Sequence, residues 1–190
     1  MYKTVASIQV RMGSSRLPGK VMRDLCGKPV LRRIVDRVRQ SKQIDEAVIT
    51  TSNNSKDDII VEYCQQNNIE VFRGSEDNVL ERILKSMQYY KADIGVTLFG
   101  DCPCVDYTII DQMINIFKNN FGKYDYVGND LKTTYPPGLE VEVYSIQALQ
   151  DAYKRNSDPT IKEHGTLFIR KNPQLYSLLK SFILLVVFAI

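Results

Sequence analysis

The chain has 190 residues, of which 44% are hydrophobic and 25% are charged, and its formal net charge is +3. These values are close to those of average globular proteins, so they argue against a disordered chain and against a basic tail that binds polyanions. A chain of this length can form one domain with an ordinary hydrophobic core. The cations are concentrated in the first forty residues, which indicates a local binding site for an anion.

Cysteines and the chain ends narrow the class of protein further. The four cysteines are widely separated except for the pair Cys102 and Cys104, and with a single histidine they indicate neither a disulfide framework nor a structural zinc site. The sequence begins almost at once with a strand pattern and has no basic and apolar leader, so we expect a cytoplasmic protein. The apolar run at 182–190 is far shorter than the ~20 residues of a membrane span, and we interpret it as a buried terminal strand or the end of a chain cut short.

In the first half of the chain, apolar runs rich in β-branched residues alternate with segments of helical period. This alternation is typical of βαβ units around a mostly parallel sheet. The predicted elements are, in chain order, strand 5–10, a helix from Pro29, strand 47–51, a helix from Ser55, strand 70–72, a helix capped by Asp77 that runs to about Tyr90, and strand 94–99.

The second half of the chain predicts a change of strand direction, because a polar loop with a Pro-Pro-Gly turn separates two strand patterns. The predicted elements are helix 107–118, strands 124–127 and 139–144, a helix from Ser145 to about Arg155, and a helical segment 160–170 that holds His164. We therefore expect a three-layer αβα domain over 1–175 with a mixed, mostly parallel, Rossmann-like sheet. Residues 176–190 read as an atypical apolar tail.

Three polar segments follow predicted strands directly: 11–20, 51–54 and 100–103. In open α/β sheets, ligands bind in the crevice beyond the carboxyl ends of the strands. We therefore expect these three segments to meet in one cleft.

The loop over 11–20 contains three cations, two hydroxyls and two glycines. Such a loop can surround a polyphosphate with backbone N–H groups and with guanidinium donors. It lacks the Gly-x-x-x-x-Gly-Lys-Ser/Thr order of a Walker loop. A solvated basic loop stays an alternative, although the position directly after a buried strand favours anion binding.

Several side chains could supply acid, base or metal chemistry. Asp101 stands where an apolar strand stops, a position that suits a Mg²⁺ ligand, and an Asx-turn residue is the alternative. Glu140 and Glu142 alternate with apolar residues and would point to one side of their strand, either toward a metal or substrate or toward solvent. His164 is a candidate base or substrate ligand, with a structural role as the alternative.

An ordered set of motifs resembles the cytidylyltransferases, most closely the spore coat polysaccharide biosynthesis branch, which is related to the CMP-Kdo and CMP-sialic acid synthetases. The likeness covers about residues 3–175. The motifs that carry it are Ile8-Gln9-Val10-Arg11-Met12-Gly13-Ser14-Ser15-Arg16-Leu17-Pro18-Gly19-Lys20, Thr50-Thr51-Ser52-Asn53, the segment 72–80, Gly100-Asp101-Cys102-Pro103, the segment 135–143, and Glu163-His164-Gly165-Thr166.

This resemblance implies a nucleotide-diphospho-sugar transferase fold of the glycosyltransferase-A type, a Mg²⁺-dependent reaction with CTP, and a homodimer. It implies roles for residues as well. Lys20, Arg11 and Asp101 would be catalytic, with Asp101 and Glu142 as metal ligands. The nucleotide would be bound by Gln9, Val10, Arg11, Gly13, Ser14, Ser15, Arg16, Lys20, Thr51, Ser52, Asn53, Arg73, Asp77 and Gly100. The sugar would be bound by Asn129, Thr134, Glu140 and His164.

The expected reaction transfers CMP from CTP to a sugar acid or related sugar and releases pyrophosphate, for the synthesis of cell-surface glycans. One alternative is a glycosyltransferase of the same fold, although a nucleotide diphosphate donor needs no cradle such as the loop over 11–20. Another is a truncated remnant that binds nucleotide without turnover. Nucleic-acid binding is disfavoured because no recognised motif for it is present.

Overall fold

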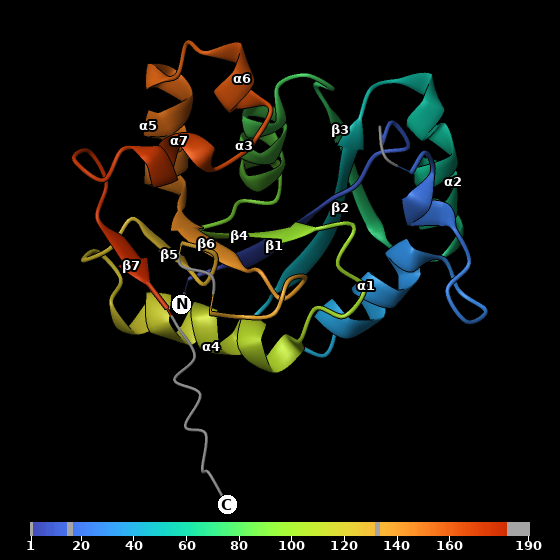
Figure 1. The fold of residues 1–190 in the computed structure, drawn as a ribbon, viewed down its shortest axis with the longest axis horizontal. Helices are drawn as coiled ribbons and strands as arrows, with labels where there is room; N and C mark the ends of the chain where they lie inside the picture. Colours follow the sequence, from blue (N-terminus) through green and yellow to red (C-terminus); the bar gives the residue numbers. More distant parts are fainter. Residues whose placement is uncertain (1, 15–16, 132–133, 182–190) are drawn as a thin grey trace, which may run out of the picture.

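The computed structural model describes residues 2–14, 17–131 and 134–181. Its centre is a seven-stranded sheet in the order β3-β2-β1-β4-β6-β5-β7 (Figure 1). Among the described strands, only β6 runs against its neighbours, so the mixed, mostly parallel sheet predicted from the sequence is confirmed. The strands are β1 (Thr4–Gln9), β2 (Glu46–Ser52), β3 (Glu70–Gly74), β4 (Ile94–Phe99), β5 (Tyr126–Gly128), β6 (Glu142–Ser145) and β7 (Leu178–Lys180).

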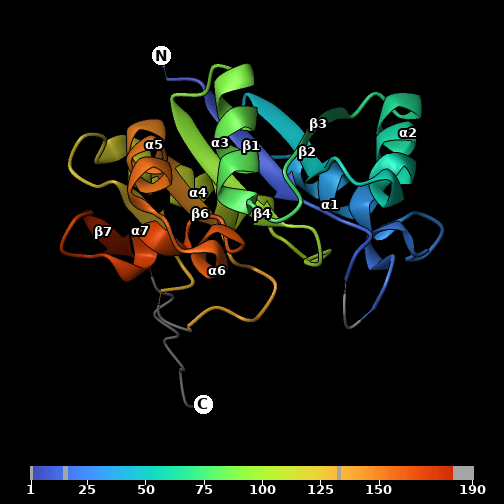
Figure 2. The same cartoon turned by 90° about the horizontal axis from the view of Figure 1, so that it is seen from above.

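Helices cover both faces of the sheet and give three layers. One apolar cluster joins one face to α1, α2 and α4, and the other joins the opposite face to α3, α5 and α7. Seen from above, α3 lies over the middle of the sheet with α5 beside it (Figure 2). The helices are α1 (Val30–Val38), α2 (Asp58–Gln66), α3 (Val79–Tyr89), α4 (Tyr107–Asn119), α5 (Ile146–Arg155), α6 (Pro159–Lys162) and α7 (Leu167–Lys171), with 3-10 turns at Lys20–Met22 and Ser55–Asp57.

Strand β1 is buried on both faces, but the two faces differ in polarity. Ala6 and Ile8 belong to the apolar cluster with α1 and α4. Because side chains alternate along a strand, Ser7 and Gln9 point to the opposite face, beneath α3. The end of β1 under α3 is therefore polar, and these side chains require hydrogen-bond partners there.

The structure differs from the sequence prediction at the start of α3 and within the helix predicted over 160–170. Asp77 was predicted to cap the third helix, but the cap is Asn78, whose side chain accepts from the backbone N–H of Glu81, while Asp77 is exposed. The helix predicted over 160–170 is two short helices, α6 and α7. Gly165 between them has φ of 56°, which interrupts the helical path, so His164 lies in a turn rather than on a helix.

The strands near the end of the chain also differ from the prediction. Strand β6 begins at Glu142 rather than at 139, so Glu140 precedes the strand. Strand β7 was not predicted; it pairs in parallel with β5 along the edge of the sheet. The terminal strand predicted at 182–190 lies outside the described residues. Within the described part of the chain, none of the helices is long and apolar enough to cross a membrane.

Candidate active site

A pocket of about 520 Å³ opens beyond the carboxyl ends of β1 and β4 and extends along α3 to α7. Its volume is within the roughly 300–1,000 Å³ usual for small-molecule sites. The pocket lies where the chain order of the sheet reverses, because β1 has β2 on one side and β4 on the other. The residues that were predicted to bind the nucleotide and that line this pocket are Gln9, Val10, Arg11, Ser14, Lys20 and Gly100. The pocket is also lined by Asp101 and Glu142, which were predicted as metal ligands, and by His164, which was predicted to bind the sugar.

Lys20 and Asp101 meet at one end of this pocket. Lys20 begins the 3-10 turn after Gly19, and Asp101 lies in the turn that follows β4. The Lys20 Nζ donates to Asp101 Oδ2 at 2.7 Å. Burial alone would raise the pKa of Asp101, but the hydrogen bond and charge of Lys20 hold it below its ordinary value. The carboxylate is thus ionised at neutral pH beside a cation.

Arg82 is a site residue that the sequence analysis missed. It lies on α3, is 2% exposed, and donates to Gln9 Oε1 at 3.0 Å and to the Ser75 carbonyl at 2.8 Å. Burial, followed by the charge of Arg11, lowers the pKa of Arg82 to about 10, so the guanidinium remains charged at neutral pH. Strand β1 gave a partial signal, since the inward-facing Gln9 required a polar partner, but the sequence did not indicate which helix would supply it.

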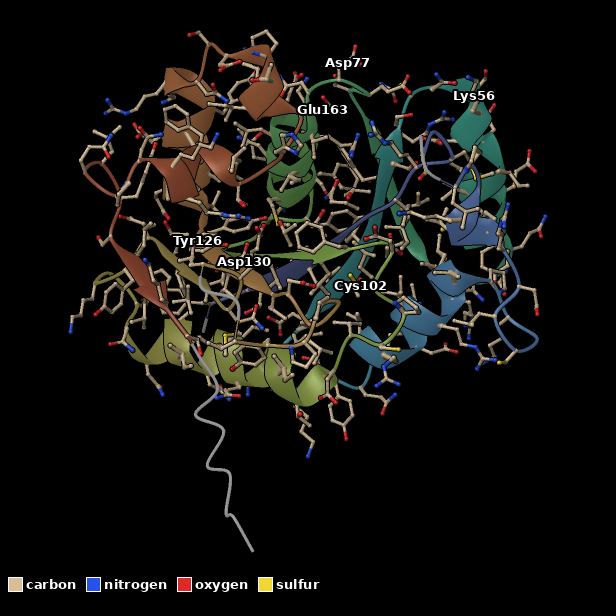
Figure 3. All side chains as sticks on the ribbon, in the orientation of Figure 1. Lys56, Asp77, Cys102, Tyr126, Asp130 and Glu163 are labelled. Carbon is tan, nitrogen blue, oxygen red and sulfur yellow. The ribbon has the colours of Figure 1, made fainter. Side chains whose placement is uncertain are left out.

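The other end of the pocket borders an ionic cluster, defined here as Asp130, Glu142 and Arg170, of which Glu142 and Arg170 line the pocket and Glu142 is buried. Arg170 Nη1 lies 2.6 Å from Asp130 Oδ2 and 2.8 Å from Glu142 Oε1. The Thr166 hydroxyl donates to Glu142 Oε2 at 2.7 Å. The Tyr126 hydroxyl donates to Asp130 at 3.1 Å, and the two side chains lie together in Figure 3.

Glu142 has an unusual protonation behaviour within this ionic cluster. Its side chain is 2% exposed, and burial together with the charge of Asp130 raises its pKa to about 7. Against its own burial, the charges of Glu142 and Asp130 raise the pKa of Arg170. The guanidinium therefore stays protonated, whereas burial and the charge of Asp130 favour the neutral form of Glu142.

Some residues predicted to bind the nucleotide do not line the pocket. Thr51 and Ser52 donate hydrogen bonds to buried Asp57. Arg73 donates to the carbonyls of Ser52 and Asn54 and thereby joins β3 to the end of β2. The backbone N–H of Asn53 donates to the carbonyl of Gly74. Gly13, Asn53 and Asp77 are exposed to solvent. Ser15 and Arg16 lie outside the described residues.

Most of the residues predicted to bind the sugar likewise do not line the pocket. Asn129 is 1% exposed; it donates to the Leu139 carbonyl and accepts from the N–H of Val141, so it closes the loop between β5 and β6. Glu140 accepts from the N–H of Gly138 at 2.7 Å. Thr134 is half-buried in the same loop, and neither it nor Glu140 lines the pocket. Among the predicted sugar residues, His164 does line it.

Comparison with known proteins identifies the family. The family model described as cytidylyltransferase matches residues 5–187. The chain belongs to the cytidylyltransferase family. The spore coat polysaccharide biosynthesis protein SpsF of Bacillus subtilis is 40% identical over 177 residues, which are 89% of this chain and 70% of that protein.

Two further relatives agree with this family. A 3-deoxy-manno-octulosonate cytidylyltransferase of Chlamydia trachomatis is 30% identical over 140 residues, which are 72% of this chain and 54% of that protein. The solved structure of a cytidylyltransferase from Leptospira borgpetersenii is 30% identical and superimposes with a TM-score of 0.92, covering 96% of this chain and 77% of that one. The fold expected for a nucleotide-diphospho-sugar transferase is thus confirmed.

The pocket of this cytidylyltransferase suits Mg²⁺ that arrives with a nucleotide. Among the described residues, no group of three His, Cys, Asp or Glu side chains is arranged to hold a metal ion by itself. Mg²⁺ is usually bound by one or two carboxylates together with substrate phosphates, and it keeps several waters. The ionised carboxylate of Asp101, whose side chain is 42% exposed, fits that requirement. Both oxygens of Glu142 are already bonded, one to Thr166 and one to Arg170.

Proposed function

We propose that this cytidylyltransferase transfers CMP from CTP to a sugar acid or related sugar, with Mg²⁺ and with release of pyrophosphate, in the synthesis of cell-surface glycans. The observation that carries the proposal is the convergence of Lys20 and Asp101 at one end of a pocket that is also lined by Arg11, Ser14 and Gln9. These groups supply both the cations that a triphosphate needs and a carboxylate for its metal ion.

The reaction is a displacement at the α-phosphate of CTP. A hydroxyl oxygen of the sugar forms a bond to that phosphorus and gives up its proton to water, the bond to the bridging oxygen of the β-phosphate breaks, and pyrophosphate leaves with the electron pair. Lys20 and Arg11 would neutralise the negative charge on the phosphates, since both cations line the pocket. Mg²⁺, when bound, would lower the charge repulsion between the phosphates and the attacking oxygen.

The two ends of the pocket differ in charge, and we propose that they are two subsites. Arg11, Lys20 and Arg82 make the end near β1 basic, which suits the triphosphate. The end near α7 carries Glu142, Arg170 and His164 and offers both donors and acceptors, as a sugar with many hydroxyls requires. We assign the sugar to this second end.

The proposal is tested by incubating the protein with CTP labelled at the α-phosphate, Mg²⁺ and a panel of acceptors. The panel contains Kdo-like eight-carbon acids, nine-carbon nonulosonates, neutral sugars and polyols. Appearance of the label in a sugar-linked product, with an equal amount of pyrophosphate, supports the proposal. Release of the label as free CMP with every acceptor, or transfer from UTP at the same rate as from CTP, contradicts it.

We also propose that the enzyme acts in the cytoplasm as a homodimer. The use of CTP, an intracellular nucleotide, by the family supports the cytoplasm, and the homodimer rests on the family resemblance alone. Sedimentation equilibrium of the purified chain measures the oligomeric state directly, and a single species with the 21.8 kDa mass of one chain contradicts the dimer.

A further inference from the structure

The basic loop of the nucleotide subsite is closed at its base by backbone hydrogen bonds. The carbonyl of Met12 accepts from the N–H of Ser14 at 2.9 Å and from the N–H of Gly19 at 3.0 Å. Gly19 has φ of 69°, a left-handed conformation that a glycine adopts without strain, and Lys20 follows it. Met12 and Gly19 thus form the neck of the loop. Because Lys20 follows Gly19 directly, the neck fixes the backbone position from which the Lys20 side chain extends.

A buried carboxylate from another part of the chain holds this neck. Asp57 is 2% exposed, and its Oδ1 accepts from the N–H of Met12 at 2.8 Å. Its Oδ2 accepts from the N–H of Ser52 at 3.0 Å, from the Thr51 hydroxyl at 2.9 Å and from the Ser52 hydroxyl at 2.5 Å. One oxygen therefore holds the loop after β1, and the other holds the end of β2.

The charge of Asp57 is maintained by these contacts. Burial alone would raise its pKa, but the hydrogen bonds from Met12, Ser52 and Thr51 together lower it below the ordinary value. A carboxylate that accepts several hydrogen bonds in its ionised form is stabilised in that form. The same charge opposes the repulsion between Arg82 and Arg11, because it raises the pKa of Arg82 while Arg11 lowers it.

We propose that Asp57 is a positioning residue for nucleotide binding: it fixes the neck of the loop at Met12 and thereby places Lys20 opposite Asp101. The inference rests on the proposed function, since it assigns the loop to the triphosphate. Asp57 itself is outside the residues that line the pocket, so it acts through the loop and not by touching the nucleotide.

The substitution Asp57→Asn tests this role with little change in volume. An asparagine keeps one acceptor oxygen but replaces the other with an NH₂ donor, which then faces an N–H donor on one of the two sides. A matched control is Asp111→Asn. Asp111 also accepts from a serine hydroxyl and from backbone N–H groups, those of Lys42 and Gln43, but it lies on α4 away from the pocket.

The first measurement is hydrogen exchange of the backbone amides in peptides that cover 11–20, in the protein without nucleotide. We expect faster exchange in Asp57→Asn and unchanged exchange in Asp111→Asn. Thr51→Val removes one hydrogen bond but keeps the carboxylate; it gives a smaller change in the same direction and replaces Asp57→Asn should that variant fail to fold. Exchange equal to wild type in the folded variant overturns the proposal.

The second measurement is the affinity for CTP with Mg²⁺, determined by calorimetry at a temperature where all variants are folded. Loss of one hydrogen bond to a charged group predicts binding at least about tenfold weaker in Asp57→Asn. Asp111→Asn keeps the wild-type affinity. Wild-type affinity in Asp57→Asn overturns the inference, whereas absence of CTP binding in the wild-type protein overturns the proposed function and leaves the exchange measurement to decide the role of Asp57.

Discussion

The Nζ of Lys20 lies 2.7 Å from Oδ2 of Asp101, although the two residues are 81 positions apart in the sequence. The pairing of β1 with β4 produces this contact, because Gln9 and Phe99 at the ends of the two strands are in register. Each strand is followed by a short segment that carries one of the two charges. A cation for phosphate and a carboxylate for metal are thus placed together by the topology of the sheet.

Removal of the cation is expected to abolish most of the turnover while the fold survives. In Lys20→Ala the developing charge on the phosphates loses one stabilising group, which typically costs about two to three orders of magnitude in rate, or roughly 2.7–4 kcal/mol. Steady-state release of pyrophosphate from CTP measures this loss. Lys85→Ala, which removes an exposed lysine of α3, is the control and should keep the wild-type rate. Full activity of Lys20→Ala refutes the assignment.

Removal of the carboxylate should abolish the effect of Mg²⁺ on nucleotide binding. Asp101→Asn keeps the size of the side chain but loses the charge that a hard cation prefers. Calorimetric titration with CTP, with Mg²⁺ or with EDTA, should give equal affinities for the variant and unequal ones for wild type. Persistence of the full Mg²⁺ effect in Asp101→Asn shows that another group binds the metal.

The same substitution also predicts a change of stability at acid pH. Since the pKa of Asp101 is lower in the folded protein than its ordinary value of 3.8, its charge stabilises the fold above that pH. This contribution is lost as the pH falls through the lower folded pKa. Urea unfolding from pH 5 to pH 2 should therefore show a smaller loss for Asp101→Asn than for wild type, and parallel losses contradict the ion pair.

Gly100 is expected to be required for structural reasons, although the family resemblance assigned it to the nucleotide. A Cβ at this position would lie 2.3 Å from the carbonyl oxygen of Gln9 and 2.4 Å from Val10 Cγ1. Gly100→Ala must therefore push β1 and β4 apart, at a cost of about 1–3 kcal/mol. Urea unfolding without nucleotide measures it, and wild-type stability in this variant restores a role in ligand binding alone.

Glu142 predicts a pH dependence of opposite sign. Its pKa is about 7 in the folded protein and 4.5 in the unfolded chain, so unfolding releases a proton between these values. Stability from this group is therefore greatest below the unfolded pKa and falls as the pH rises toward 7. Thermal unfolding of wild type and Glu142→Gln should diverge in favour of the variant over this range. A difference that does not vary with pH contradicts the assignment.

Much of the fold was predictable because the signals that determine it are local. Runs of β-branched residues marked β1, β2 and β4, and Pro29 and Ser145 marked the starts of two helices. Strand β7 was missed because Leu178–Lys180 is short and gains its stability from pairing with β5, a contact between segments that are distant in sequence. The break at Gly165 was missed because an isolated glycine is tolerated inside a helical pattern, and it is the φ of 56° in the structure that shows the interruption.

In the candidate site too, residues marked by local sequence were predictable and residues whose role depends on packing were not. Lys20 and Asp101 were predictable since each follows a strand whose end must reach the crevice. Arg82 and Arg170 lie inside helices, where an arginine reads as a solvent-facing residue until the packing of the helix is known. Asp57 falls within the helix predicted from Ser55, and its partners come from the loop after β1 and the end of β2, which the sequence does not place beside it.

The central claim is that this pocket binds CTP with Mg²⁺, and thermal unfolding with each of the four nucleoside triphosphates tests it most directly. A ligand that binds only the folded state must raise the unfolding temperature. We predict a rise with CTP that depends on Mg²⁺, exceeds that with ATP, GTP or UTP, and disappears in Lys20→Ala. An unfolding temperature that none of the four nucleotides changes contradicts the account.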